Sequence, residues 1–152
     1  MGSPFRFGLQ RVRDLRAHDE EQAKERFAHT LSARLRGEAM LRAAEERLLD
    51  AQGDAMGETT LTGPVSGASL VSRQAWVDRL KATRDDAAVK LRGLDTELQA
   101  SRDSLTHASQ RREVLDQLKE RQREAHRRES ERREGAELDE MALRVHTRGR
   151  AA

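Results

Sequence analysis

The side chains that could do chemistry in this chain are carboxylates, arginines and histidines, and their spacing does not suit a catalytic or metal site. The chain has five histidines and no cysteine, which excludes disulfides and thiolate metal sites. The histidines lack ligand spacing, and none stands beside a candidate nucleophile: His18, His29, His107, His126 and His146. The carboxylates are expected on exposed helix faces, where nothing would shift a pKa toward acid–base work. We therefore expect neither an enzyme nor a bound cofactor or metal.

The aromatic residues favour binding over catalysis. The chain has three phenylalanines and one tryptophan, and Phe5 and Phe7 both lie among arginines near the N-terminus. Residues two apart on a helix point in nearly opposite directions. We therefore expect Phe5 to pack on a second helix near Leu115 and Leu118, and Phe7 to point outward toward a partner.

Composition favours long helices with a mixed-sign surface. Charged residues make up 37% of the chain and aromatic residues 3%, which is too little bulky apolar material for an ordinary globular core of this length. The 29 basic and 27 acidic side chains are interleaved, and glutamates within RQREAHRRESERR would repel phosphates, so nucleic-acid binding is disfavoured. No apolar run approaches the ~20 residues of a membrane span. We expect a cytoplasmic protein with no direct membrane insertion.

Turn-forming residues divide the chain into three parts. Gly, Pro, Ser and Thr gather in the stretch QGDAMGETTLTGPVSGAS, a composition typical of a loop. We predict one all-α domain over residues 1–152, with helix 1 over about 5–52, a flexible loop over about 53–69 and helix 2 over about 70–148.

The second predicted helix carries a heptad pattern. Steps of three and four residues give a seam that is apolar except at two arginines and a serine, which is typical of a coiled-coil strand. The seam comprises Val77, Leu80, Arg84, Ala87, Leu91, Leu94, Leu98, Ser101, Leu105, Ala108, Arg112 and Leu115.

The first predicted helix has a weaker version of this stripe. Its apolar members are Leu9, Val12, Ala23, Phe27, Leu31, Leu41 and Leu48, and it is interrupted by Arg16, Asp19 and Glu38 or Glu45. A loop tethers the two helices at high effective concentration, so we expect an antiparallel coiled-coil hairpin. Because the helices are unequal, residues beyond about 118 have no partner within the chain, and the C-terminal helix is expected to overhang.

Same-face Glu–Arg pairs run through the expected overhang and support a single helix in water. Apolar residues then return at helical spacing: Leu138, Met141, Ala142 and Val145. Two interpretations of this stripe are open. It is either a frayed amphipathic end or a binding face, because a helix without an intramolecular partner has nothing else to bury it against.

The single tryptophan also has two open interpretations. Trp76 lies one position off the seam at Val77, so it either caps the hairpin core against Leu70 or Leu48, or presents an anchor to a partner together with Leu80.

Three stretches of the sequence resemble the FliJ family of flagellar type III export proteins. The first, FRFGLQRVRDLRAHDEEQAKERFA, has an aromatic–basic–aromatic start that leads through Leu-Gln into a charged helix, with matches at Phe5, Arg6, Phe7, Leu9, Gln10, Val12, Leu15, Glu20 and Glu21. The stretches REVLDQLKERQREA and ELDEMALRV are similar to the family's C-terminal part, with matches at Leu118, Lys119, Glu120, Leu138, Asp139 and Glu140. Arg13 departs from the family pattern, because an apolar residue is expected there.

The resemblance implies a non-catalytic stalk. Members of the family are thought to insert the end that carries both termini into the hexameric export ATPase FliI, to contact the export gate protein FlhA and to handle export chaperones. The chain would then lie peripherally at the cytoplasmic face of the inner membrane. A stalk of a virulence-type secretion system and a generic coiled-coil scaffold are the alternatives.

The basic, partly apolar ends of the chain suit this role, since charge would steer them into an acidic pore. We assign ATPase binding to Phe5, Arg6, Phe7, Gln10, Arg11, Arg13, Leu138, Met141, Arg144 and Val145, and export-gate binding to Trp76 and Leu80.

Overall fold

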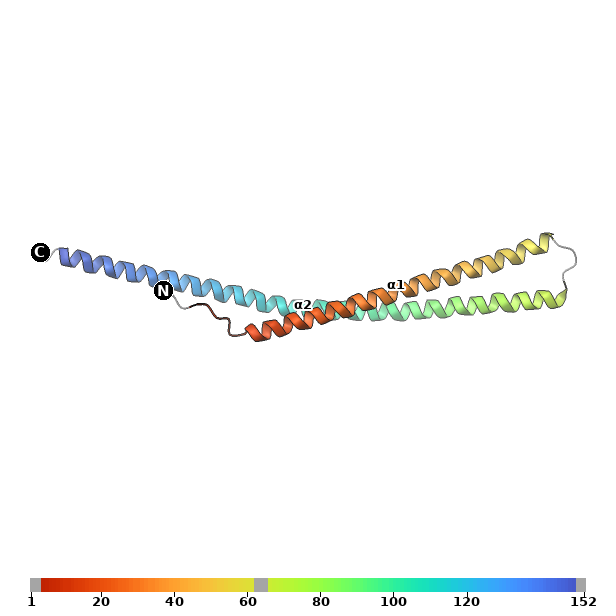
Figure 1. The fold of residues 1–152 in the computed structure, drawn as a ribbon, viewed down its shortest axis with the longest axis horizontal. Helices are drawn as coiled ribbons and strands as arrows, with labels where there is room; N and C mark the ends of the chain where they lie inside the picture. The colour runs from red at the N-terminus through yellow and green to blue at the C-terminus, as the bar shows by residue number, and fades with distance from the viewer. Residues whose placement is uncertain (1–3, 62–65, 150–152) are drawn as a thin grey trace. The chain divides into compact units, whose positions relative to one another are not determined.

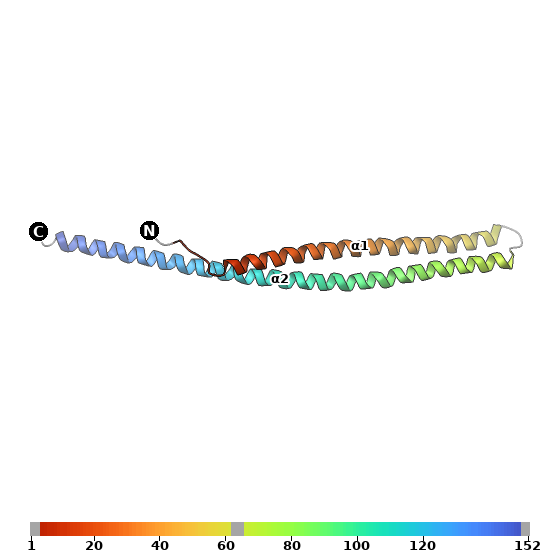
Figure 2. The same ribbon diagram turned by 60° about the horizontal axis from the view of Figure 1, so that its bottom comes forward.

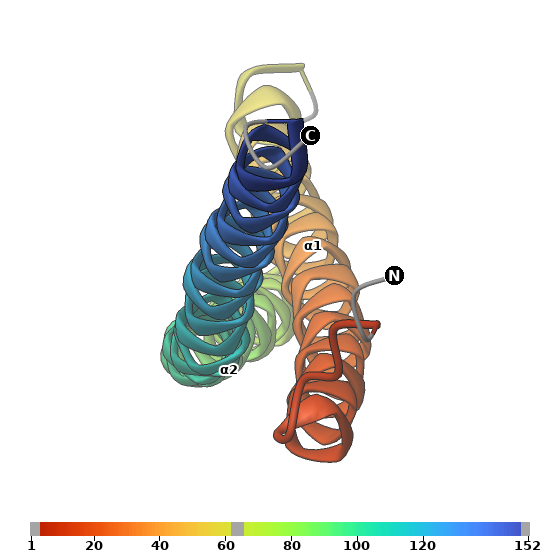
Figure 3. The ribbon, with the colours of Figure 1, turned by 90° about the vertical axis from the view of Figure 1, so that its left-hand side faces the viewer.

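Two long helices account for nearly all of the described residues (Figure 1). The computed structural model describes residues 4–61 and 66–149. Helix α1 spans Gln10–Leu61 and helix α2 spans Gly67–Gly149, and these described ranges contain no strand. Both helices are continuous when the molecule is turned (Figure 2) and when it is viewed from its left-hand side (Figure 3). The all-α class is thereby confirmed.

The helices begin where local hydrogen bonds cap them. Gly8 and Leu9 form a turn, and the Gln10 N–H donates to the Phe7 carbonyl at 3.1 Å, so residues 4–7 precede α1 and do not belong to it. Before α2, the hydroxyl of Ser66 accepts from the Ser69 N–H at 3.2 Å. This is the usual action of an N-cap serine, and it starts α2 at Gly67, earlier than the expected residue 70.

Helix α1 continues to Leu61, so residues 53–61 are helical where we expected the start of a loop. Glycine and threonine in this stretch lower helix propensity by about 1 kcal/mol or less each, but neither forbids a helix as proline does. The first proline after Pro4 is Pro64. It lies outside the described residues, as does the rest of the part of the expected loop that falls at 62–65.

The packing divides into two compact units. Unit 1 comprises Met1–Glu21 and His107–Ala152, and unit 2 comprises Gln22–Thr106. Within unit 2, the orange-to-yellow part of α1 lies beside the green part of α2 (Figure 2). Thr30 contacts Ser101 through their hydroxyls at 2.7 Å, and the Arg34 guanidinium donates to Asp95 at 3.0 Å. Numbers rise along α1 as they fall along α2, so the two segments of unit 2 are antiparallel.

The seam predicted for α2 matches the burial pattern of this helix. Every predicted seam position from Val77 to Leu115 is buried or half-buried. Val77 and Ala108 are the most buried, at 7% and 8% exposure. The 3.5-residue repeat therefore identified the inward face of α2 correctly.

The stripe predicted for α1 is partly wrong. Ala23, Phe27, Leu41 and Leu48 are buried or half-buried as expected, but three other members are exposed: Leu9 at 41%, Val12 at 41% and Leu31 at 37%. Inward positions that the stripe did not include are taken by Arg13, Glu20, Thr30, Arg34 and Gly37, all buried or half-buried. Arg16, which was expected to interrupt the stripe, is also half-buried. Polar residues can occupy a seam when the facing helix supplies partners for them.

Gly37 marks a close approach of the helices in unit 2. A Cβ atom at this position would lie 2.7 Å from Leu94 Cδ1 and 3.6 Å from Leu91 Cδ1. Only glycine lets the leucines of α2 pack against the α1 backbone here without moving.

Neither helix contains, within its described residues, a segment long and apolar enough to cross a lipid bilayer.

Candidate functional site

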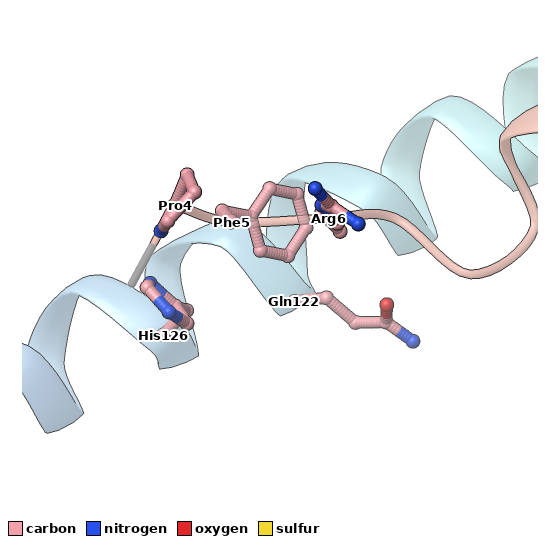
Figure 4. A pocket seen from close by; sticks show the side chains of 5 residues that line it. All are labelled: Pro4, Phe5, Arg6, Gln122 and His126. Atoms are coloured by element: carbon pink, nitrogen blue, oxygen red, sulfur yellow. The ribbon is translucent and has the colours of Figure 1, made fainter. Parts of the chain in front are cut away.

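The N-terminal segment of residues 4–9 packs within unit 1 (Figure 4). The Phe5 ring lies against the imidazole of His126 on α2, with ring centroids 5.7 Å apart and planes at 58°. Pro4, Phe5 and Arg6 line an open pocket together with Gln122 and His126. Phe7 is 8% exposed and belongs to the buried core.

The roles expected for the two phenylalanines are therefore wrong. Phe7 is buried and does not point outward, and Phe5 lies beside His126 instead of near Leu115 and Leu118. The expectation assumed that both rings stand on a helix. Because residues 4–7 precede α1, the helical rule for their directions does not apply.

A polar network joins α1 to α2 within unit 1. Arg112 donates to Glu20 and also to Asp116. Asp116 accepts from Arg13 Nε at 2.8 Å. One turn further along, Lys119 Nζ donates to the amide oxygen of Gln10 at 2.9 Å. The order of these contacts makes the two segments of unit 1 antiparallel.

The network shifts the pKa of its members. Hydrogen bonding from Arg13 is the main cause that lowers the pKa of Asp116, and it outweighs the opposing effect of burial. Hydrogen bonds to carboxylates likewise raise the pKa of Arg13 through Asp116 and that of Arg112 through Glu20. Each group is thereby stabilised in its charged form.

Two predicted ATPase-contact residues thus have internal partners. Gln10 binds Lys119 and Asp14, and Arg13 binds Asp116 and lies 3.5 Å from Asp14. Arg13 was the departure from the family pattern, and its guanidinium fills the seam position where an apolar residue was expected. Arg6 and Arg11 are exposed.

The end of α2 exposes its apolar residues. Leu138 is 65% exposed, Met141 57% and Val145 73%. Arg144 is exposed as well and donates to Glu140 at 2.7 Å. Ion pairs one turn apart brace the preceding stretch, with Arg133 and Glu129 at 3.0 Å and Arg128 and Glu124 at 3.7 Å. These exposed apolar residues form a surface able to bind a partner.

Trp76 is 51% exposed on unit 2, and the guanidinium carbon of Arg79 stands 5.5 Å from its ring centroid. This is a cation–π geometry at the surface. Leu80 is half-buried in the seam. The exposure favours the anchor interpretation of Trp76 over the capping one.

Sequence reasoning missed a groove on unit 1, which we call the Val12–Val114 groove. Arg16 and Arg111 flank apolar side chains there, and Val114 is 60% exposed. Its lining comprises Val12, Arg16, His107, Gln110, Arg111, Val114 and Leu115. One residue in the sequence could have indicated this groove. Val114 is apolar but lies outside the predicted seam, two positions after Arg112.

Within residues 4–61 and 66–149, no three His, Asp or Glu side chains gather as a metal site would require. The charged groups with perturbed pKa values face each other across the helices and hold the fold together.

Comparison with known proteins identifies one family. A family model described as the flagellar FliJ protein matches residues 5–151, which is nearly the whole chain. No curated protein and no solved structure matches.

Proposed function

This chain belongs to the FliJ family of flagellar proteins, and on that premise we propose that it is the coiled-coil stalk of a flagellar export apparatus. The FliJ family consists of non-catalytic export proteins, and membership makes this chain an export-associated coiled-coil protein of a type III system. The proposal adds the partners: the stalk binds the centre of the hexameric export ATPase, couples it to the export gate protein, and handles export chaperones. It would do so at the cytoplasmic face of the inner membrane.

The stalk we propose is an antiparallel hairpin in which the end of α2 extends beyond α1. The contacts within each unit support this arrangement, since Arg13 meets Asp116 in unit 1 and Arg34 meets Asp95 in unit 2. The exposure of Leu138 and Val145 at 65% and 73% supports an α2 end whose apolar side chains α1 does not cover. The expectation that all residues beyond about 118 lack a partner in the chain is wrong, because Phe5 lies against His126.

The exposed end of α2 is the observation that carries the ATPase assignment. Leu138, Met141 and Val145 supply apolar contact area, and Arg144 adds positive charge. Burying such residues in a partner releases water from apolar surface, while charge steers the encounter.

The N-terminal segment has a divided role in this proposal. Phe5, Arg6 and Arg11 contact the ATPase, because they are exposed or half-buried. Phe7, Gln10 and Arg13 hold the segment in place through burial and their bonds to α2.

The gate protein is proposed to bind Trp76 and Leu80 on unit 2. A half-exposed indole backed by Arg79 is the kind of rigid, amphipathic anchor that dominates interfaces.

A pull-down with the cognate export ATPase tests the proposal. We expect the chain to promote hexamer assembly and to stimulate ATP hydrolysis, and a Leu138→Ala/Met141→Ala variant to lose most of both effects. The matched control is Leu49→Ala/Met40→Ala, which removes the same residue types at 66% exposure each from unit 2. If the wild-type chain changes neither hexamer assembly nor ATP hydrolysis, the stalk role is wrong. If both variants lose these effects equally, the assignment of the ATPase site to the end of α2 is wrong.

A further inference from the structure

Two exposed surfaces of unit 1 have opposite charge and both expose apolar side chains. The Val12–Val114 groove places Val12 and Val114, 41% and 60% exposed, beside Arg16 and Arg111. Arg16 forms an ion pair with Asp19 at 3.1 Å. Arg111 Nε donates to the uncharged backbone carbonyl of His107 at 3.3 Å. The groove is therefore basic around an apolar floor.

The end of α2 has the complementary character. Leu138 and Met141 stand among Glu137, Asp139 and Glu140, and all five side chains are exposed. The segment also carries Arg144, which donates to Glu140 at 2.7 Å, so three carboxylates against one arginine give residues 137–145 a net charge of −2. An amphipathic helix with acidic flanks is the kind of ligand that a basic, apolar groove binds.

We propose that the end of α2, residues 137–145, docks in the Val12–Val114 groove of a second copy of this chain. The segment cannot reach its own groove, because α2 is one continuous helix from Gly67 to Gly149 and Val114 and Leu138 lie about 36 Å apart along it. A second copy supplies the missing groove. By two-fold symmetry the same contact then forms twice, which gives a closed antiparallel dimer.

The charge sequence of α2 supports the antiparallel register. Placing Val114 opposite Leu138 of the second copy also places His107 opposite Val145. Along the stretch between them, Arg121 and Glu124 lie on the side of the helix that carries Val114. Opposite charges then meet at these two levels: Arg121 with Glu131, and Glu124 with Arg128. Each of these pairs occurs twice in the dimer. A shift by one residue in one direction would oppose Arg121 to Arg132 and Glu124 to Glu129, so like charges disfavour that register.

The dimer covers the apolar surface that the single chain leaves exposed at the end of α2. The self-association does not depend on the export role proposed above, and its test uses the purified chain alone. A negative result for either proposal therefore does not contradict the other. If both hold, self-association and ATPase binding compete for Leu138 and Met141.

Sedimentation and light scattering of the full chain test the association. The monomer mass is 17.2 kDa, and we expect a concentration-dependent species of twice that mass between about 1 and 200 µM, weakened by salt. Val114→Glu and Leu138→Lys should each weaken dimerisation by about tenfold or more. The first places a carboxylate beside Glu137 and Asp139 of the second copy, and the second places an ammonium group beside Arg111 of the groove. Val89→Glu is the matched control, since Val89 is 57% exposed on α2 within unit 2. A single 17.2 kDa species at every concentration overturns the proposal. A dimer that neither Val114→Glu nor Leu138→Lys weakens more than the control also overturns it.

Disulfide mapping tests the register and exploits the absence of native cysteine. Chains with Val114→Cys and chains with Leu138→Cys are prepared separately, mixed and oxidised. We expect the mixture to form a mixed disulfide much faster than either variant alone forms its own. Fast disulfides in each separate variant indicate parallel pairing and overturn the register, and circular dichroism confirms that each variant remains helical.

Discussion

Arg112 of α2 donates to the carboxylate of Glu20 of α1, and Glu20 is only 6% exposed. Both residues occupy inward positions of their helices, where a coiled coil usually has apolar side chains. Asp116 and Arg13 extend the pair into a network. A charge at such a position is tolerated only while its partner faces it, so the network ties α1 and α2 of unit 1 to one register.

Removing one member of this pair should cost more than removing both. We expect Arg112→Met to lower the thermal midpoint by about 5 °C, because it takes the guanidinium of α2 away from Glu20. Glu20→Leu combined with Arg112→Met should recover much of the loss, since two apolar side chains can fill the seam. Thermal unfolding followed by circular dichroism measures this double-mutant cycle, and additive losses would contradict the coupling.

Acid should weaken the Asp116 contact. The pKa of Asp116 is lowered in the folded chain, so its contribution to stability is complete above the unfolded value of about 3.9 and is lost as the pH falls through the folded value. The raised pKa values of Arg13 and Arg112 add no change in this range, because both groups stay charged below pH 12. The thermal midpoint of the wild-type chain should decrease as the pH falls below about 4, and we expect this decrease to be smaller in Asp116→Asn. Asp86→Asn, at an exposed carboxylate of unit 2, should leave that decrease unchanged.

Two glycines should respond oppositely to alanine. Gly93→Ala adds a Cβ in open space on α2 and should stabilise the chain by about 0.5–1 kcal/mol through helix propensity. Gly37→Ala gains the same propensity but drives its Cβ to 2.7 Å from Leu94 Cδ1. We expect Gly37→Ala to be less stable than Gly93→Ala by about 1–2 kcal/mol. Chemical denaturation measures both, and equal stabilities would show that Leu94 moves away at no cost.

The N-terminal segment should depend on Phe7 more than on Phe5. Phe7 is 8% exposed, whereas Phe5 is half-buried beside His126. We expect Phe7→Ala to cost about 2 kcal/mol and to speed amide hydrogen exchange at the start of α1, with a smaller effect for Phe5→Ala. Hydrogen exchange resolved to residues 9–14 separates the two variants, and a larger effect of Phe5→Ala would reverse this order.

Trp76→Ala should separate binding from folding. Because Trp76 is 51% exposed and its resolved aromatic contact is the surface cation–π pair with Arg79, the loss of stability should be about 1 kcal/mol or less. Binding to the gate protein should fall strongly if the indole is its anchor. Calorimetry and a binding titration on the same variant measure the two effects. A large fall in the thermal midpoint would support the capping interpretation instead.

The inward face of α2 could be predicted because its seam is mostly leucine, valine and alanine, and apolar periodicity marks a seam of that kind. The same method was right for only part of α1. Leu9 and Val12 look like seam residues, yet both are 41% exposed, while Arg13 and Glu20 lie inward. No periodicity in α1 alone distinguishes an arginine that faces Asp116 from an arginine that faces water.

The extent of α1 shows a second limit. Residues 53–61 carry the glycines and threonines of a loop but lie in the helix. Propensity differences of about 1 kcal/mol or less per residue are too small to end a helix by themselves. The early start of α2 at Gly67, by contrast, has a local signal in the Ser66 cap, which the expected boundary overlooked.

The sequence by itself therefore determined the class of the protein: two long helices, one well-marked seam, an exposed apolar stripe at the C-terminal end and the family motifs. Each of these depends on residue types at fixed spacings along one helix. The tertiary structure alone decided which face of α1 is inward, which phenylalanine is buried and where the Val12–Val114 groove lies. Those outcomes depend on pairs such as Glu20 with Arg112 and Arg13 with Asp116, whose members are about a hundred positions apart in the chain. A buried charge gains its stability from a partner that only the register of the two helices can supply.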